Sequence, residues 1–137
     1  MNRENSFIKT DEENKPLVYS CSGCSSAAQM ANYIAVQLDR KQIAEMSCIA
    51  GVGGNVKSLV RTALSGKKII AIDGCALACC KACLGNHSVE LDLYFELTAM
   101  GIKKRKHEDF DKEQAADLLR FIGDKIVYDN VTVCPVI

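Results

Sequence analysis

The sequence of 137 residues carries no excess of charge of either sign. Lys and Arg together number 17, Asp and Glu together number 17, and the formal net charge at neutral pH is zero. Nucleic acids and acidic membrane surfaces attract proteins that present a strong positive field. The composition therefore predicts neither a nucleic-acid-binding protein nor a protein of the membrane surface.

Long apolar runs are absent as well. The first sixteen residues, MNRENSFIKTDEENKP, are polar and contain no apolar segment of the secretory type. No later run approaches the ~18 apolar residues that cross a bilayer. We therefore expect a cytoplasmic protein. In that reducing compartment, cysteines serve as metal ligands, redox groups or small buried side chains more often than as structural disulfides.

Several catalytic patterns are also missing. The glycines of GVGGN at residues 51–55 are not followed by the lysine and hydroxyl of a phosphate-binding loop, and no cysteine begins a CxxxxxR phosphatase loop. No serine has a His and Asp arrangement that indicates a hydrolase triad. The sequence therefore argues against nucleotide, phosphate-ester and triad-hydrolase chemistry.

Short apolar runs alternate with helical periodicity from residue 17 onward. Strands are expected at residues 17–20, 44–50, 67–73 and 89–100. Helices are expected at residues 25–40, 56–66 and 109–126. The third strand is apolar throughout, whereas the fourth alternates apolar and polar residues as an edge strand does. The pattern predicts an α/β fold, a small open three-layer sandwich of about four mostly parallel strands with helices on both faces.

We divide the chain into two parts. Residues 1–16 are charged, lack periodicity and end in Pro16, so we expect a flexible N-terminal arm. Residues 17–137 are expected to form a single α/β domain. Its last segment, residues 127–137, is expected to be a small added strand or a mobile end, and Pro135 disfavours the strand.

Eight cysteines dominate the chemistry, and half of them lie in GCALACCKACLG at residues 74–85. Cys21 follows LVYS, Cys48 follows AEMS within the second expected strand, and Cys75 follows IIAID with Gly74 between them. The carboxyl ends of parallel strands meet at one edge of a sheet, where the ligand sites of α/β proteins form. We therefore expect these three thiols to approach one another.

Cys79 offers a fourth thiol. It lies four residues beyond Cys75, and a helix starting near residue 75 would place both on one face. The simplest ligand set for a tetrahedral zinc ion is then Cys21, Cys48, Cys75 and Cys79. Two further candidates remain, because Cys24 lies at a strand-to-helix turn, where helix amides can face its sulfur, and Cys83 extends the helical stripe by one turn.

Two alternatives use the same thiols differently. Cys21 and Cys24 form a CxxC beside a βαβ pattern, which also suits a thiol redox or sulfur-handling enzyme with these two residues as catalytic candidates. Cys75, Cys80 and Cys83 have the Cx4CxxC spacing of one class of iron–sulfur protein. A helix here would turn Cys80 about 100° away from its neighbouring cysteine. We therefore expect Cys80 to be buried, and an iron–sulfur cluster is less favoured than zinc.

Other residues are expected at the same edge. The amides of Gly51, Gly53 and Gly54 are candidates to face an anion or metal thiolates through positive φ and close approach, with a plain tight turn as the alternative. Asp73 is expected to cap the following helix, a commoner role than orienting a ligand.

The segment KKRKH at residues 103–107 is the one concentrated positive patch. It is either a solvated loop or a docking surface for an anion or a protein partner. The residues that would form this surface are Lys103, Lys104, Arg105 and Lys106. His87 and His107 have no helical HxxxH or CxxH partner, so we expect both at the surface rather than on a metal.

Three segments, CSGCSSAAQMAN, CIAGVGG and AIDGCALAC, resemble in this order the motifs of the DGC-domain family, bacterial proteins described as predicted zinc-binding proteins. GIKKRKHEDFD is similar to the segment that closes that domain, so the resemblance covers residues 17–112. It implies a small α/β domain with a zinc site on Cys21, Cys48, Cys75 and Cys79. Family members with the fuller CSGC motif are similar at the positions of Cys24 and Cys83 too. The sequence departs at Ala76, where the family often has proline, and at Cys80, where a small residue is more usual.

The residues thus predict a zinc-binding protein whose thiolate cluster is structural or serves metal handling or sensing. The thiol redox enzyme is the alternative. The sequence leaves open whether the protein is an enzyme, which metal is native and which oligomer it forms.

Overall fold

The computed structural model describes residues 15–132 and contains one sheet. The strands are β1 (Leu17–Ser20), β2 (Glu45–Met46), β3 (Ile69–Asp73) and β4 (Leu93–Glu96). They lie in the order β2-β1-β3-β4, and all three pairings are parallel. The expected parallel sheet is confirmed, and so is the edge position of the fourth strand. Buried at all five positions, β3 lies inside the sheet between β1 and β4.

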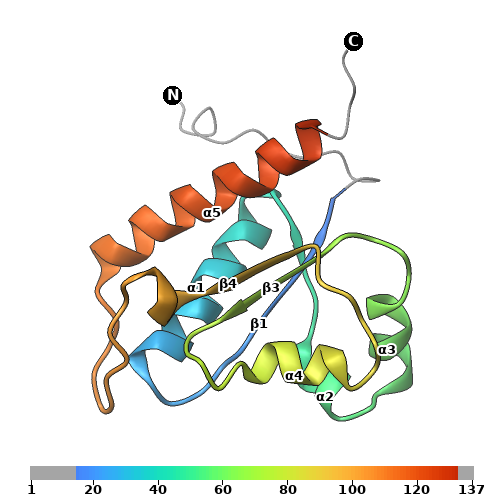
Figure 1. Cartoon of the computed structure of the whole chain (residues 1–137), viewed down its shortest axis with the longest axis horizontal. Helices are drawn as coiled ribbons and strands as arrows, with labels where there is room; N and C mark the ends of the chain where they lie inside the picture. Colours follow the sequence, from blue (N-terminus) through green and yellow to red (C-terminus); the bar gives the residue numbers. More distant parts are fainter. Residues whose placement is uncertain (1–14, 133–137) are drawn as a thin grey trace.

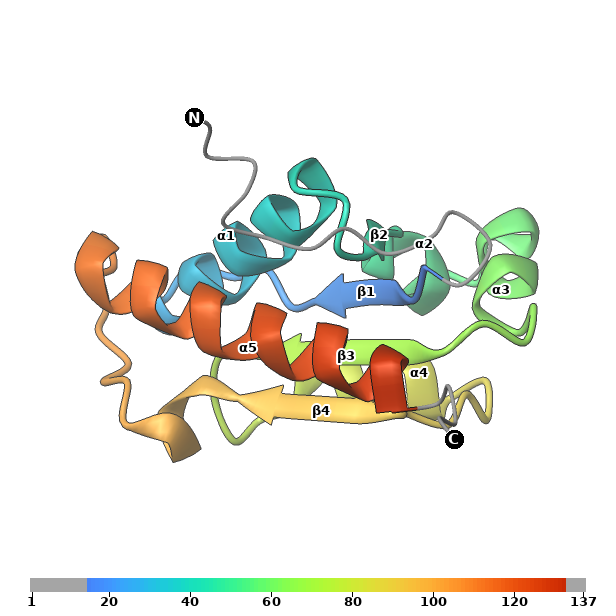
Figure 2. The same ribbon diagram turned by 90° about the horizontal axis from the view of Figure 1, so that it is seen from above.

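Helices cover both faces of this sheet (Figures 1 and 2). One face carries α1 (Ser26–Arg40) and α5 (Lys112–Thr132). The other face carries α2 (Ile49–Gly53), α3 (Lys57–Ala63) and α4 (Cys79–Gly85). A short 3-10 helix, η2 (Leu97–Met100), follows β4. The chain is therefore the three-layer α/β sandwich that the alternation predicts.

Two hydrophobic cores follow from the alternation of side chains along the strands. On β1, Val18 faces α1 and α5, whereas Leu17 and Tyr19 face the three short helices. On β3, Ile70 and Ile72 join the first core, and Ile69 and Ala71 join the second. Each face of the sheet thus has its own core, so the loops at the strand ends are left to form a site.

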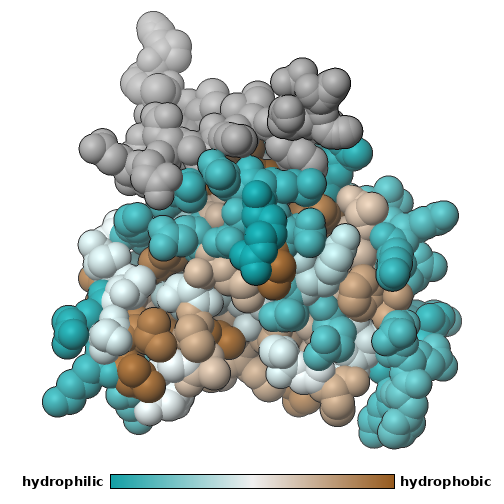
Figure 3. Space-filling view, turned by 180° about the vertical axis from the view of Figure 1, so that it is seen from behind, coloured by the Kyte–Doolittle hydropathy of each residue, from teal (hydrophilic) through white to brown (hydrophobic). Residues whose placement is uncertain are grey.

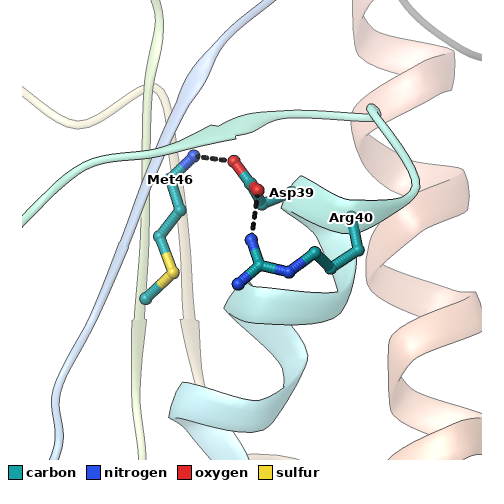
Figure 4. Close-up of polar contacts among 3 residues, drawn as sticks. All are labelled: Asp39, Arg40 and Met46. Atoms are coloured by element: carbon teal, nitrogen blue, oxygen red, sulfur yellow. Dashed lines mark hydrogen bonds and ion pairs between the residues drawn. The ribbon is translucent and has the colours of Figure 1, made fainter.

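Side chains define both ends of α1. Ser25 is the N-cap, and its Oγ accepts a hydrogen bond from Ala28 N at 3.1 Å. At the other end, Asp39 accepts from Met46 N at 2.9 Å and pairs with Arg40 at 2.6 Å (Figure 4). The exposed ion pair adds little stability. The bond to Met46 fixes the short β2 against the end of the helix.

The second strand is shorter than predicted. The expected strand at residues 44–50 ends at Met46, because Cys48 caps α2. The Sγ atom of Cys48 accepts a hydrogen bond from Gly51 N at 3.3 Å. The helix α2 begins at Ile49, directly after this cap, so residues 49 and 50 belong to a helix and not to the predicted strand.

The end of the chain also differs from the prediction. Residues 127–132, expected as a strand or a mobile end, continue α5 to Thr132. Tertiary contacts continue beyond the predicted end at residue 126, because Val127 packs against the first core and Asp129 Oδ2 lies 3.4 Å from Lys68 Nζ. Residues 133–137 and most of the predicted arm, residues 1–14, lie outside the described part of the chain.

Surface character varies around the molecule. In the lower half of Figure 3, apolar and weakly polar surface in tan, brown and white lies between hydrophilic residues at both sides. Neither α5 nor any other helix between residues 15 and 132 has the length and apolar character of a membrane span.

Gly74 provides a test of how closely β3 approaches α1. A Cβ atom built on Gly74 would lie 2.6 Å from Ala27 C and 2.7 Å from Ala28 N, which are backbone atoms that cannot rotate away. We expect Gly74→Ala to lower the free energy of unfolding by about 1–3 kcal/mol, measured by urea denaturation. Gly85→Ala is the matched control, because a Cβ atom at that position would meet nothing within 4 Å. Equal stability of the two variants would contradict the close approach.

Candidate functional site

A cavity of about 400 Å³ opens beyond the carboxyl ends of β1 and β3. Of the seven cysteines that the structure describes, all free, six line it. They are Cys21, Cys24, Cys75, Cys79, Cys80 and Cys83. We call this feature the thiol cavity. The expectation that strand-end thiols meet is correct for Cys21 and Cys75, since both line its wall.

Cys21 is held where β1 ends. Its backbone amide donates to Ile72 O at 3.1 Å, and its Sγ accepts from Gly74 N at 3.2 Å. Burial raises the pKa of the Cys21 thiol to about 11, and the hydrogen bond from Gly74 only partly opposes that rise. In the absence of a metal, Cys21 is therefore a protonated and weakly nucleophilic thiol near neutral pH.

Cys75 does not lie on the helix that was expected to carry it. The helix α4 begins at Cys79, and residues 74–78 form a turn in which Ala78 N donates to Cys75 O at 3.1 Å. Ala78, at φ 54° and ψ 47°, is in the left-handed region, where a helix cannot continue. The predicted one-face arrangement of Cys75 and Cys79 is thus wrong, although both thiols line the same cavity.

Asp73 explains the late start of α4. Its carboxylate accepts hydrogen bonds from Cys80 N at 2.8 Å, Lys81 N at 3.0 Å and Tyr94 Oη at 2.9 Å. The predicted capping role is confirmed, but the amides it caps belong to residues seven and eight positions further on. Only 1% of Asp73 is exposed. Burial, and then the hydrogen bond to Asp73, raise the pKa of the Tyr94 hydroxyl, which therefore stays a donor.

Helix α4 contributes three thiols in two environments. Cys79 and Cys83 lie one turn apart, exposed and half-buried respectively. Cys80 is only 1% exposed and packs in the second core, as predicted. Burial raises the pKa of the Cys80 thiol strongly, so it is a neutral part of the cavity wall.

The glycines that follow Cys48 serve packing. Gly51 and Gly53 lie inside α2, and Gly54 is its C-cap with a φ of −90°, so the expected positive φ at these residues is wrong. A Cβ on Gly51 would lie 2.0 Å from Leu59 Cδ1, and one on Gly53 would lie 3.0 Å from Cys83 Sγ. The predicted close approach at these glycines is present, but the groups that approach them are the side chains of Leu59 and Cys83. Cys48 itself is exposed and is not among the residues that line the thiol cavity.

The basic segment lies at the same edge of the sheet, as expected. Ser26 N donates to Arg105 O at 2.9 Å, and Arg105 N donates to Ser26 Oγ at 2.9 Å, so the loop is fixed to the start of α1. Lys104 lines the thiol cavity, with its Nζ 3.3 Å from Cys75 Sγ. The sequence identified the basic patch but not the contact between Lys104 and Cys75, because these residues are 29 positions apart.

The histidines lie away from the thiols. The ring of His87 is half-buried, with Nε2 3.1 Å from Val52 O, so it is less exposed than predicted. His107 is exposed as predicted. Neither residue lines the thiol cavity.

The thiols that line the cavity are of a chemical type that binds metal ions. Thiolates are ligands for zinc and other thiophilic ions. Within residues 15–132, no three Cys, His, Asp or Glu side chains converge closely enough to hold an ion. A cysteine side chain has one rotatable bond between backbone and sulfur, so rotation about χ1 is the movement that coordination would require first.

Known proteins share this sequence pattern. Residues 17–122 match the DGC domain, from the start of β1 into α5. This chain belongs to the DGC domain family. A relative from Pseudomonas aeruginosa, the anaerobic and virulence modulator AnvM, is 52% identical over 112 residues, which cover 82% of this chain and 86% of AnvM. No solved structure matches the chain. The family resemblance of the three cysteine motifs is thus confirmed.

Asp73 is expected to be a large contributor to the stability of the DGC domain. Asp73→Asn keeps the shape but turns an amide NH2 toward groups that are themselves donors. We expect it to lower the free energy of unfolding by about 2–4 kcal/mol, whereas Tyr94→Phe should cost about 1 kcal/mol. Denaturation by urea measures both. Asp109→Asn, at an exposed aspartate, should leave stability unchanged. An unaltered Asp73→Asn variant would show that the carboxylate is not needed.

Alkylation tests the protonation state of Cys21. In metal-free, reduced protein at pH 8, its reaction with iodoacetamide should be about a hundredfold slower than that of a thiol with the ordinary pKa of 9.0, because its thiolate fraction is lower. The rate should rise about tenfold per pH unit up to pH 11 and show no plateau near pH 9. Peptide mapping by mass spectrometry measures the alkylation rate of Cys21 at each pH, with the exposed Cys24 as internal reference. A plateau near pH 9 would contradict the raised pKa.

Proposed function

We propose that this DGC domain is a regulatory metal-binding module whose thiol cavity holds a thiophilic cation, with zinc as the favoured ion. The observation that supports this most is the convergence of six thiols on one cavity from three separate segments. Those segments are residues 21–24, residue 75 and residues 79–83. The regulatory part draws on the relative AnvM, which is named as a modulator.

The candidate ligands are the thiols that can reach the cavity without unfolding the core. They are Cys21, Cys24, Cys75, Cys79 and Cys83. Cys80 is excluded from the proposal because its thiol is buried in the second core. Cys48 belongs to the sequence-based ligand set but is not part of the cavity lining, so its variant decides whether it joins the coordination shell. A bound cation would supply positive charge that replaces the thiol protons.

Metal binding is favoured over thiol redox catalysis by the state of Cys21. A redox nucleophile needs a thiolate at neutral pH, and burial, which raises the pKa of Cys21, disfavours that role for Cys21, one of the two catalytic candidates. A cation overcomes that cost by direct coordination. The hydrogen bond from Gly74 N to Cys21 Sγ is of the kind that stabilises metal thiolates. The proposal takes the compartment to be the reducing cytoplasm, where free thiols persist.

Metal analysis of protein purified anaerobically without chelator tests the proposal. We expect about one zinc ion per chain and roughly four thiols that become reactive only when it is removed. Cys75→Ser and Cys79→Ser should each lower the affinity for zinc at least tenfold in a competition titration with a chromophoric chelator.

Two further cysteine variants complete the design. Cys134→Ser is the matched control, since no ligand set includes Cys134, and it should retain the metal. Cys48→Ser preserves the helix cap, because serine is a preferred N-cap residue, so loss of zinc there would add Cys48 to the shell. Protein without metal that forms a Cys21–Cys24 disulfide readily would favour the redox alternative instead.

A further inference from the structure

The thiol cavity is larger than a metal ion requires. Its volume of about 400 Å³ is many times the ~30 Å³ that one water molecule occupies in the liquid. Cavities of this size are in the range that holds small organic ligands. The space beside the thiols is therefore large enough for a small organic ligand as well as a metal ion.

One positive charge faces this space. Among the described residues that line the thiol cavity, Lys104 is the sole cation. Its Nζ lies 3.3 Å from Cys75 Sγ, and no carboxylate within residues 15–132 lies at ion-pair distance from it. Asp73 is the one carboxylate of the lining, but it is only 1% exposed and its oxygens already accept three hydrogen bonds. Among the described lining residues, the Lys104 ammonium is therefore the charged group open to an anion that enters the cavity.

Apart from the thiols and the exposed Ser22, the remaining lining offers few groups to a strongly polar ligand. The carboxylate of Asp73 already accepts three hydrogen bonds, and Ser25 Oγ is engaged as the cap of α1. Apolar side chains form much of the wall: Ala28, Ile49, Ala50, Leu77 and Ala78. Leu77 is 73% exposed at the rim, a large apolar residue left uncovered. These surroundings favour an apolar body and a single charged group.

We propose that the thiol cavity binds a small organic acid, a monocarboxylate whose charge pairs with Lys104 and whose compact apolar body packs against Ile49 and Leu77. The proposal goes beyond the metal site and does not depend on it, because every contact it uses is present without a metal. If the domain is regulatory, a small organic acid is the class of ligand to which it would respond.

Titration calorimetry with benzoate and benzamide tests the charge requirement. The two probes have the same shape and differ in charge. In metal-free, reduced protein, we expect benzoate to bind about fivefold more tightly than benzamide, since an exposed charge pair contributes modestly. Lys104→Gln should remove this preference. Lys106→Gln is the matched control, because Lys106 is an exposed lysine of the same loop outside the cavity lining, and it should keep the preference.

Acetate tests the apolar body, because it carries the charge without the ring, and it should bind at least tenfold more weakly than benzoate. Amide shifts in 15N NMR spectra should fall on residues 21–28, 49–53 and 75–83. Equal binding of benzoate and benzamide, or a preference that survives Lys104→Gln, would overturn the inference. Zinc content is measured separately on the same protein. A Lys104-dependent preference in a chain that never binds zinc overturns only the metal proposal, and zinc binding without the preference overturns only this one.

Discussion

The buried carboxylate of Asp73 is the interaction on which the site depends. It ends the central strand β3, holds the first amides of α4 and accepts the hydroxyl of Tyr94 from β4. One charged group thus joins three elements and fixes the helix that carries Cys79 and Cys83 relative to the strand that leads to Cys75. A charge so deeply buried is tolerated only when its oxygens are satisfied, so the hydrogen bonds and the position of α4 require each other. The turn at residues 74–78 connects the end of β3 to the start of α4, whose positions are both fixed by Asp73.

Most of the fold follows from periodicity and helix caps. The unbroken apolar run of β3 predicts a strand covered on both faces, and the alternation around Phe95 predicts an edge strand. Ser25 caps the start of α1, and Asp111 caps α5 by accepting a hydrogen bond from Gln114 N. The sequence does not reveal the helix boundaries that are set by tertiary contacts. Asp73 caps amides seven and eight residues away, which no local rule anticipates. The helix α5 runs past its expected end, where Val127 packs against the first core and Asp129 pairs with Lys68.

The site was predictable to the extent that it obeys the strand-end rule. Cys21 and Cys75 follow neighbouring parallel strands, so topology alone brings them to one edge. Cys48 follows a strand of only two residues and becomes a helix cap, which moves it out of the cavity lining. The role of Lys104 depends on a contact between a loop and a turn that are far apart in sequence, and four similar basic residues in a row give no sign of which one faces the thiols. The role of the glycines at residues 51 and 53 could not be predicted from the sequence either, because helix packing and anion binding both favour glycine there.

The two proposed ligands of the cavity should oppose each other. In the proposed metal site, four thiolates around one divalent cation would leave a net negative charge, and Lys104, 3.3 Å from Cys75 Sγ, would neutralise part of it. An organic acid would meet a different field in the metal-free state, where no anionic metal–thiolate cluster is present and no carboxylate of the described residues lies at ion-pair distance from Lys104. Metal loading therefore weakens binding of the acid, and by thermodynamic reciprocity the acid weakens binding of the metal by the same factor. Because Lys104, which would bind the acid, lies 3.3 Å from Cys75, a candidate metal ligand, this antagonism needs no change of fold, only a change of charge within one cavity.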